Sequence, residues 1–212
     1  MKGKFLHKQT LLGVSALLFL TTAITSMVIN RPDDIGAYRA SLADENDSLA
    51  SVAAFDQVYK VLMHPRCMNC HPAGDVPLQD DDSHIHSMLP QRGTEGKGIL
   101  TMKCANCHGA EGVPGENTPP GNPKWHMPPA DMKMVFEGKS ASELATLMVD
   151  FERNGKKDMQ ELREHANDTL VKAGWNMGGD RSLPPLTYDE FREAWFTWID
   201  KGAYAPAEED KQ

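Results

Sequence analysis

Two short stretches of the sequence nearly repeat each other, residues 67–77 (CMNCHPAGDVP) and residues 104–114 (CANCHGAEGVP). In each, two cysteines are separated by two residues, and a histidine directly follows the second cysteine. All four cysteines of the chain lie in these two stretches. A histidine at one given position has a chance frequency of roughly one in forty, so two such coincidences are about one in a thousand or rarer. The pattern therefore indicates a chemistry that needs two thiols and one imidazole, twice.

The first thirty residues indicate export. A basic start (MKGKFLHKQT) precedes residues 11–29 (LLGVSALLFLTTAITSMVI), which are apolar and uncharged. This segment is longer than the usual signal-peptide core of about 7–15 residues and just under the ~20 of a spanning helix. Basic residues before it and acidic residues after it place the rest of the chain outside the cytoplasm. We expect residues 1–30 to be an uncleaved signal anchor; a cleaved signal peptide is the alternative.

An exported chain with four cysteines could form disulfides, and a repeated C-x-x-C could hold zinc. A disulfide inside each motif would suit a thiol–disulfide enzyme, and four sulfurs together would suit a structural zinc ion. Neither accounts for the two histidines. The 33 residues between the cysteine pairs, 71–103, also exceed the usual zinc-ribbon spacer of about 15–20 residues.

C-x-x-C-H is the attachment sequence of c-type haem. The two thiols add to the two vinyl groups of one porphyrin, and the following imidazole becomes the proximal ligand of the iron. On these motifs and the export signal, the chain resembles a bacterial dihaem c-type cytochrome. The resemblance implies two haem c groups, with the thioether cysteines Cys67, Cys70, Cys104 and Cys107 and the proximal ligands His71 and His108.

The remaining sequence predicts one mainly α-helical domain. Residues 31–50 are polar and acidic and are expected to form a tether; residues 51–206 form a compact dihaem cytochrome c domain of helices and long loops, and residues 207–212 form a tail. The two motifs begin only 37 residues apart, which is too short for a complete monohaem domain before the second motif. Strand signals are few.

Helix signals are clearest at three places. Apolar residues recur at helical spacing after Ser51, in a helix that ends at His64 before Pro65. Two S/T-x-x-E capping boxes, at residues 140–143 and 187–190, begin helices near 141–153 and from 188 to about 201. Shorter helices are expected over 157–166 and up to Gly174. In monohaem cytochromes an aromatic C-terminal helix crosses the N-terminal helix, and the resemblance implies the same contact here.

The sixth ligand of each iron decides between electron transfer and catalysis, since an open position admits small molecules. His84 and His86 lie two residues apart between the motifs, and His86 is preferred. For the other iron we prefer His165, which makes both irons bis-histidine. His126 and Met127, in the proline-rich segment KWHMPP, remain alternatives to His165, and His84 remains an alternative to His86.

The predicted function is that of an exported electron-transfer protein at the outer, periplasmic face of the cytoplasmic membrane. The alternative is a small haem enzyme that reduces peroxide or a nitrogen oxide. The expected partners are redox proteins: a quinol oxidiser or dehydrogenase as donor, and a cytochrome or reductase as acceptor. Beyond residue 30 the chain carries 19 basic and 30 acidic residues, which disfavours nucleic acid and favours a basic docking partner.

Overall fold

The computed structural model describes residues 32–110, 119–176 and 181–208. The predicted signal anchor, residues 1–30, therefore lies outside the described residues. By its internal contacts the chain divides into residues 1–46 and residues 47–212. In the first unit the described part is helical.

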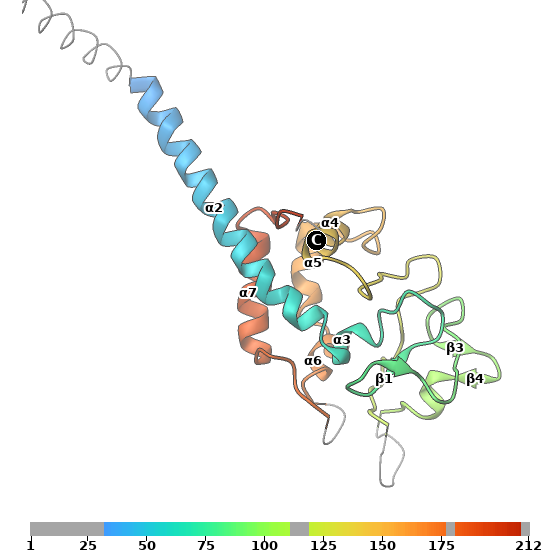
Figure 1. Ribbon diagram of the computed structural model, residues 1–212. Helices are drawn as coiled ribbons and strands as arrows, with labels where there is room; N and C mark the ends of the chain where they lie inside the picture. The colour runs from blue at the N-terminus through green and yellow to red at the C-terminus, as the bar shows by residue number, and fades with distance from the viewer. Residues whose placement is uncertain (1–31, 111–118, 177–180, 209–212) are drawn as a thin grey trace, which may run out of the picture. The chain divides into compact units, whose positions relative to one another are not determined.

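The predicted fold class is confirmed at the level of secondary structure, because the described chain is mainly α-helical (Figure 1). The helices are α2 (Pro32–Leu62), α3 (Pro65–Met68), α4 (Ala141–Val149), α5 (Met159–His165), α6 (Thr169–Ala173) and α7 (Tyr188–Asp200), with one 3₁₀ turn, η1 (Cys104–Asn106). None of the helices in the described ranges is both long enough and apolar enough to cross a membrane.

Helix α2 differs from the sequence prediction, because it begins at Pro32 and not near Ser51. Most of the stretch predicted as a tether is thus helical. Residues 39–50 (RASLADENDSLA) are rich in Ala, Leu, Arg and Glu, which have high helix propensity, and contain no Gly or Pro. A proline at the first helical position is also well tolerated, because its missing N–H has no partner there in any helix.

The helix starts at 141 and 188 are confirmed as capping boxes. The side chains of Ser140 and Thr187 accept hydrogen bonds from the backbone N–H three residues on, and the glutamate at that position bonds back to the cap. Asp158 begins α5 in the same way, with Glu161 as its partner. His64 is the N-cap of α3, where its side chain accepts from the backbone N–H of Arg66. These local contacts fix where each helix begins.

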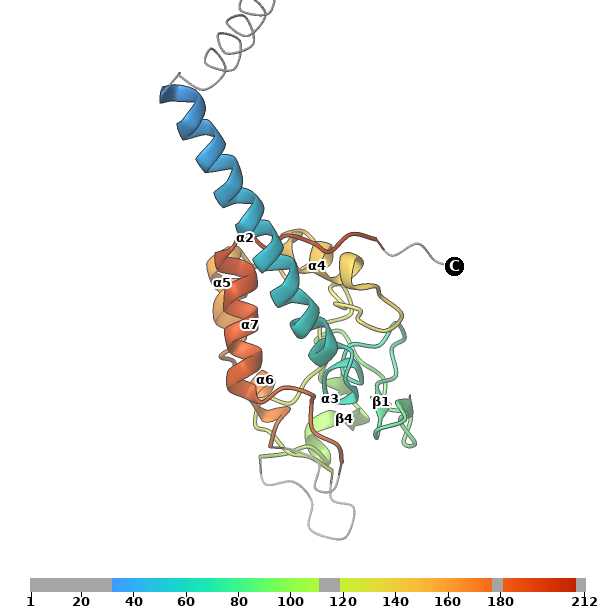
Figure 2. The same cartoon turned by 60° about the vertical axis from the view of Figure 1, so that its left-hand side comes forward.

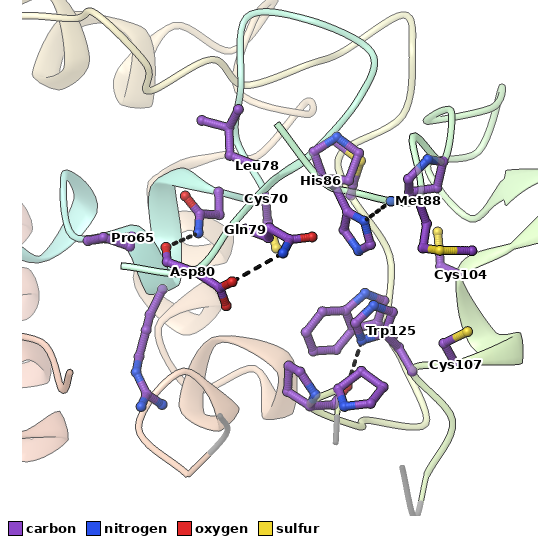
Figure 3. A pocket seen from close by; sticks show the side chains of 18 of the residues that line it. Pro65, Cys70, Leu78, Gln79, Asp80, His86, Met88, Cys104, Cys107 and Trp125 are labelled. Atoms are coloured by element: carbon purple, nitrogen blue, oxygen red, sulfur yellow. Dashed lines mark hydrogen bonds between the residues drawn. The ribbon is translucent and has the colours of Figure 1, made fainter. Parts of the chain in front are cut away.

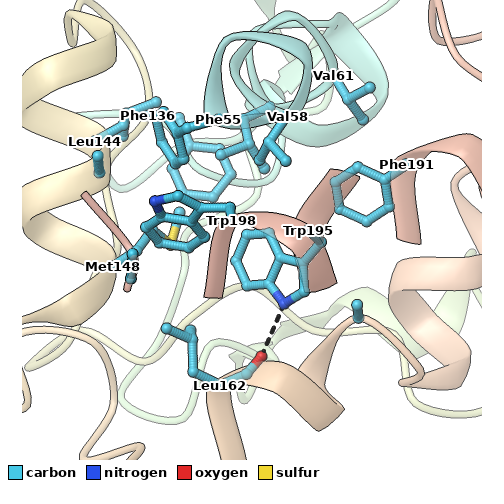
Figure 4. Close-up of a cluster of buried hydrophobic side chains, with 14 residues drawn as sticks. Phe55, Val58, Val61, Phe136, Leu144, Met148, Leu162, Phe191, Trp195 and Trp198 are labelled. Atoms are coloured by element: carbon cyan, nitrogen blue, oxygen red, sulfur yellow. Dashed lines mark hydrogen bonds between the residues drawn. The ribbon is translucent and has the colours of Figure 1, made fainter. Parts of the chain in front are cut away.

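The main hydrophobic core lies where α2 meets α7 (Figure 4). The rings of Phe55 and Trp198 are 4.7 Å apart. The hydroxyl of Ser51 donates to the Trp198 carbonyl at 2.9 Å and accepts from the Tyr204 N–H at 3.0 Å. The predicted contact between the two terminal helices is therefore confirmed. On its other side α7 lies against α5, as Figure 2 shows, where the Trp195 indole donates to the Leu162 carbonyl at 3.0 Å.

The chain between the two motifs forms two small antiparallel hairpins. Strand β1 (Leu78–Gln79) pairs with β2 (His84–Ile85), and β3 (Gly98–Ile99) pairs with β4 (Met102–Lys103). Gly98 has a φ of +86°, and a Cβ there would lie 2.4 Å from the Met102 carbonyl oxygen. Only glycine fits that turn, which leads directly into the second motif.

A buried arginine holds the loops after the first motif together. Arg92 is 1% exposed, and its guanidinium donates to the carbonyls of Pro72, Gly74 and Pro128. Its Nε lies 3.4 Å from a carboxylate oxygen of Asp75. Because a guanidinium carries several donors in a fixed plane, one side chain can order three loop segments that have no regular structure of their own.

Candidate functional site

A cavity of about 330 Å³ lies between the two motifs (Figure 3). This volume falls within the range of about 300–1,000 Å³ typical of small-molecule sites. The cavity is lined by Cys70 of the first motif and by Cys104, Cys107 and His108 of the second. Its walls are formed mostly by the hairpins and the proline-rich segment, and their apolar side chains include Leu78, Met88, Met102, Trp125 and Met127. Two groups of the first motif, Cys67 and His71, are not among its lining residues.

All four cysteines carry free thiols. Burial raises the pKa of the Cys67 thiol to about 12 and that of Cys70 to about 11. Cys70 and Cys104, one from each motif, line the same cavity. The structure therefore does not contain the disulfides that the sequence left open. The two thiols of the first motif are protonated at neutral pH.

The first motif histidine is held by backbone far along the chain. Nδ1 of His71 donates to the Met134 carbonyl oxygen at 2.8 Å, and the His71 carbonyl accepts from the Phe136 N–H at 2.9 Å. The Phe136 ring stacks on the imidazole with centroids 3.8 Å apart and planes 1° from parallel. Burial lowers the pKa of His71 to about 4. The imidazole is therefore neutral, with its proton on Nδ1 and its lone pair on Nε2.

The second motif histidine repeats this arrangement. Nδ1 of His108 donates to the Pro120 carbonyl oxygen at 2.7 Å, and the indole of Trp125 stacks on the ring at 4.2 Å and 3°. The pKa of His108 is lowered, mainly by burial. Histidines that bind a metal ion usually donate their second ring N–H to a carbonyl or carboxylate, which fixes the tautomer and the ring plane. Both motif histidines have this form.

The two histidines of the β2 region differ in where they lie. The ring of His86 lies 6.3 Å from that of His108, centroid to centroid, and His86 lines the cavity. Its Nδ1 accepts from the Met88 backbone N–H at 3.2 Å. Nδ1 of His84 donates to the carboxylate of Asp82 at 2.6 Å, on the exposed side of the hairpin loop, and His84 is not part of the cavity wall.

The other predicted distal residues are His165, His126 and Met127. Nδ1 of His165 donates to the carboxylate of Asp168 at 2.6 Å, and Nδ1 of His126 donates to the Lys124 carbonyl at 2.6 Å. Both histidines are close enough to lower the pKa of His71 electrostatically, although burial is the largest cause. Met127 is buried, 3% exposed, and lines the cavity.

Sequence reasoning missed the groups that orient the motif histidines. The carbonyls of Met134 and Pro120 have no sequence signal, because every residue has a carbonyl. Trp125 was visible in KWHMPP, directly before two candidate ligands, and an aromatic residue there could have been noted. Arg92 has no local signal, since nothing in its neighbourhood predicts burial.

These residues fit the group that the sequence predicts. Within the ranges that the structure describes, no three His, Cys, Asp or Glu side chains are grouped to hold a metal ion. A porphyrin supplies four nitrogen ligands to its iron, so the protein adds only one or two axial groups. Each motif has two free thiols followed by an imidazole whose Nδ1 donates to a carbonyl, which leaves the Nε2 lone pair for a metal ion, and this is the set of groups that a covalent haem would need. Comparison of the chain with protein-family models, with curated proteins and with solved structures finds no match.

Proposed function

We propose that this chain is an exported electron-transfer protein that carries two covalently attached haem c groups. The observation that carries the proposal is the repeated arrangement at the two motifs, in which each histidine donates from Nδ1 to a backbone carbonyl and stacks on an aromatic ring. A repeat of the sequence is thus matched by a repeat of the orienting contacts. A structural histidine in a core has no reason to show the same pair of contacts twice.

The chemistry asked of the cysteines is balanced and needs no oxidant. Each thiol adds its S–H across one vinyl C=C, so that sulfur bonds to one carbon and hydrogen to the other. The free, protonated thiols of Cys67 and Cys70 are in the form that this addition consumes. A bound haem supplies the exchange of single electrons at its iron. The four cysteines would hold the two haems, and His71 and His108, whose ring planes are fixed by their hydrogen bonds and stacked aromatic rings, would bind the irons through Nε2.

The acidic charge of the chain bears on the surface with which a partner would dock. The full chain carries a formal charge of −8, and all three lysines of the first ten residues lie outside the proposed redox domain. A basic face on a redox protein would be attracted to this surface, and the association would weaken as salt is added. We propose a membrane quinol oxidiser or a dehydrogenase as donor and a cytochrome or reductase as acceptor, with residues 1–30 holding the chain at the outer face of the cytoplasmic membrane.

The test is to produce the full chain in a host that matures c-type cytochromes and to count covalent haem by the pyridine haemochrome spectrum and intact mass. Two haems per chain, with sharp low-spin bands that carbon monoxide leaves unchanged, are expected. A chain without covalent haem would overturn the proposal. A fraction that binds carbon monoxide would favour the alternative, a small haem enzyme, and peroxide and nitrite would then be the substrates to try.

Paired variants show whether each motif holds one haem. Cys67→Ser with Cys70→Ser should leave one covalent haem, and Cys104→Ser with Cys107→Ser should leave the other. Loss of both haems from either pair, in protein that still has the helical circular dichroism of wild type, would contradict independent attachment.

A further inference from the structure

Two histidines from different loops approach each other at the cavity. His86 follows strand β2, and His108 ends the second motif; their ring centroids are 6.3 Å apart, with ring planes at 77°. Two imidazoles that share one metal ion through Nε2 have centroids roughly 6 Å apart, because each metal–nitrogen bond is about 2 Å and each nitrogen lies about 1 Å from its ring centre. The separation found here is that of two ligands on one ion.

The other candidate histidines make different contacts. Nδ1 of His165 bonds to the carboxylate of Asp168, and Nδ1 of His126 bonds to the Lys124 carbonyl. Of these three histidines, His86 alone lines the cavity together with His108. The structure therefore distinguishes His86 from the other candidates, which the sequence does not.

The backbone of His86 is fixed on both sides. Its N–H donates to the Pro77 carbonyl at 3.0 Å, and its carbonyl accepts from the Leu89 N–H at 2.8 Å. Figure 3 shows the His86 side chain pointing into the space in front of Trp125, the ring that stacks on His108. A ligand with a fixed backbone needs little reorganisation to bind.

One existing contact must change. Nδ1 of His86 accepts from the Met88 N–H at 3.2 Å, which puts the ring proton on Nε2. Coordination through Nε2 moves this proton to Nδ1 and ends that hydrogen bond. Met88 is 64% exposed, so its backbone N–H can bond to water instead.

We propose that His86 is the sixth ligand of the haem iron whose proximal ligand is His108. This rests on the proposed function, since it presupposes a haem at the second motif. It closes that iron to small molecules and makes the second haem bis-histidine, which gives a lower potential than a His/Met pair. The sixth position of the first haem then falls to a residue near His71.

The experiment compares His86→Ala with His84→Ala in the full, haem-loaded chain. His84 lies in strand β2, two residues before His86, but its ring bonds to Asp82 and does not line the cavity, so it is the matched control. Haem count, optical spectrum and electron paramagnetic resonance are measured for both. We expect two covalent haems in each variant, with half of the haem high-spin and open to carbon monoxide in His86→Ala only. Added imidazole should restore the low-spin spectrum.

The assignment to the second iron needs single-haem backgrounds. With the first-motif cysteines changed to serine, His86→Ala should convert nearly all remaining haem to the high-spin form; with the second-motif cysteines changed, it should convert none. If these chains fail to fold, His86→Met in the two-haem chain tests whether residue 86 binds an iron at all: a sulfur-to-iron band should appear for one haem, and its absence would overturn the assignment.

The outcomes separate the two claims. A wild-type chain without covalent haem at the second motif overturns the proposed function, and the ligand assignment with it. Two haems in His86→Ala that both stay low-spin, or a high-spin signal in the first-motif haem, overturn the assignment and leave the electron carrier standing.

Discussion

The imidazole of His165 donates from Nδ1 to the carboxylate of Asp168, at 2.6 Å across the end of α5. A carboxylate partner makes Nε2 of a histidine more basic and so a stronger donor to a metal ion. A stronger donor stabilises oxidised iron more than reduced iron. If His86 binds the second iron, His165 is the preferred sixth ligand of the first, and the pair with Asp168 would then lower the potential of the first haem.

Asp168→Asn should raise the midpoint potential of one haem and leave the other unchanged. The shift should be on the order of tens of millivolts, because a tenfold change in relative affinity for the two oxidation states corresponds to about 59 mV for one electron. Potentiometric titration followed by absorbance measures it. Asp189→Asn removes the same charge from an exposed position on α7 and is the control. Equal shifts in both variants would mean a general charge effect, and no shift would remove His165 from the ligands.

Arg92→Met should destabilise the haem-loaded protein by about 3 kcal/mol. The substitution leaves three loop carbonyls without their donor, and each unsatisfied buried group costs roughly 1–3 kcal/mol, offset in part where water enters. Urea unfolding gives the value. The control Arg153→Met breaks an exposed ion pair with Asp150 and should cost less than about 1 kcal/mol. Similar losses in the two variants would show that Arg92 does not order the loops.

Phe55→Ala should cost about 3–5 kcal/mol, the range for removing a fully buried aromatic side chain. Phe55 is 0% exposed and lies against Trp198, so the truncation opens a cavity between α2 and α7. Leu49→Ala, two turns earlier on α2 and 63% exposed, should stay within about 0.5 kcal/mol of wild type. If Phe55→Ala lowers the free energy of unfolding only slightly, the contact between α2 and α7 is not a main source of the stability of the domain.

The contact between Arg181 and Asp80 should stabilise the folded protein at neutral pH but not in acid. The hydrogen bond from Arg181, at 2.8 Å, holds the pKa of Asp80 below its ordinary value of 3.8. The folded state therefore binds its proton less readily than the unfolded chain does. The contribution is complete above the unfolded pKa and is lost as the pH falls through the folded pKa.

The measurement is the difference in free energy of unfolding between wild type and Asp80→Asn. At pH 6 we expect a difference of at most about 1 kcal/mol, since the pair is partly exposed. The difference should shrink as the pH falls below about 4. A difference that is constant from pH 6 to pH 3 would mean that the ion pair does not contribute.

The sequence predicted what depends on neighbouring residues. The caps at Ser140 and Thr187 need only a side chain and a backbone N–H three residues away, and both were found. The Asp158 cap follows the same pattern with aspartate in place of serine, and its signal was present in the sequence though not used. The early start of α2 differs from the prediction because that prediction weighed the polarity of residues 31–50 and not the helix propensity of their alanines and leucines.

What the sequence could not predict are the contacts between distant segments. The motifs identify the proximal histidines, but nothing near His71 indicates that Met134 supplies its acceptor. The choice among His84, His86, His126 and His165 depends equally on where separate loops come together. His84 lies in the two-residue strand β2 and His86 directly after it, and only the ring beyond the end of the strand lines the cavity.

The acceptors of the two motif histidines also imply an order of assembly. His71 is separated from Met134 by 63 positions, and His108 from Pro120 by 12. Closing the longer stretch costs about 1.5 kcal/mol more in chain entropy, from the logarithmic dependence on length. The imidazole of the second motif can thus be oriented by its own neighbourhood, while that of the first must wait until residues beyond the second motif have arrived. The motif that leaves the ribosome first is the one whose histidine is set in place last.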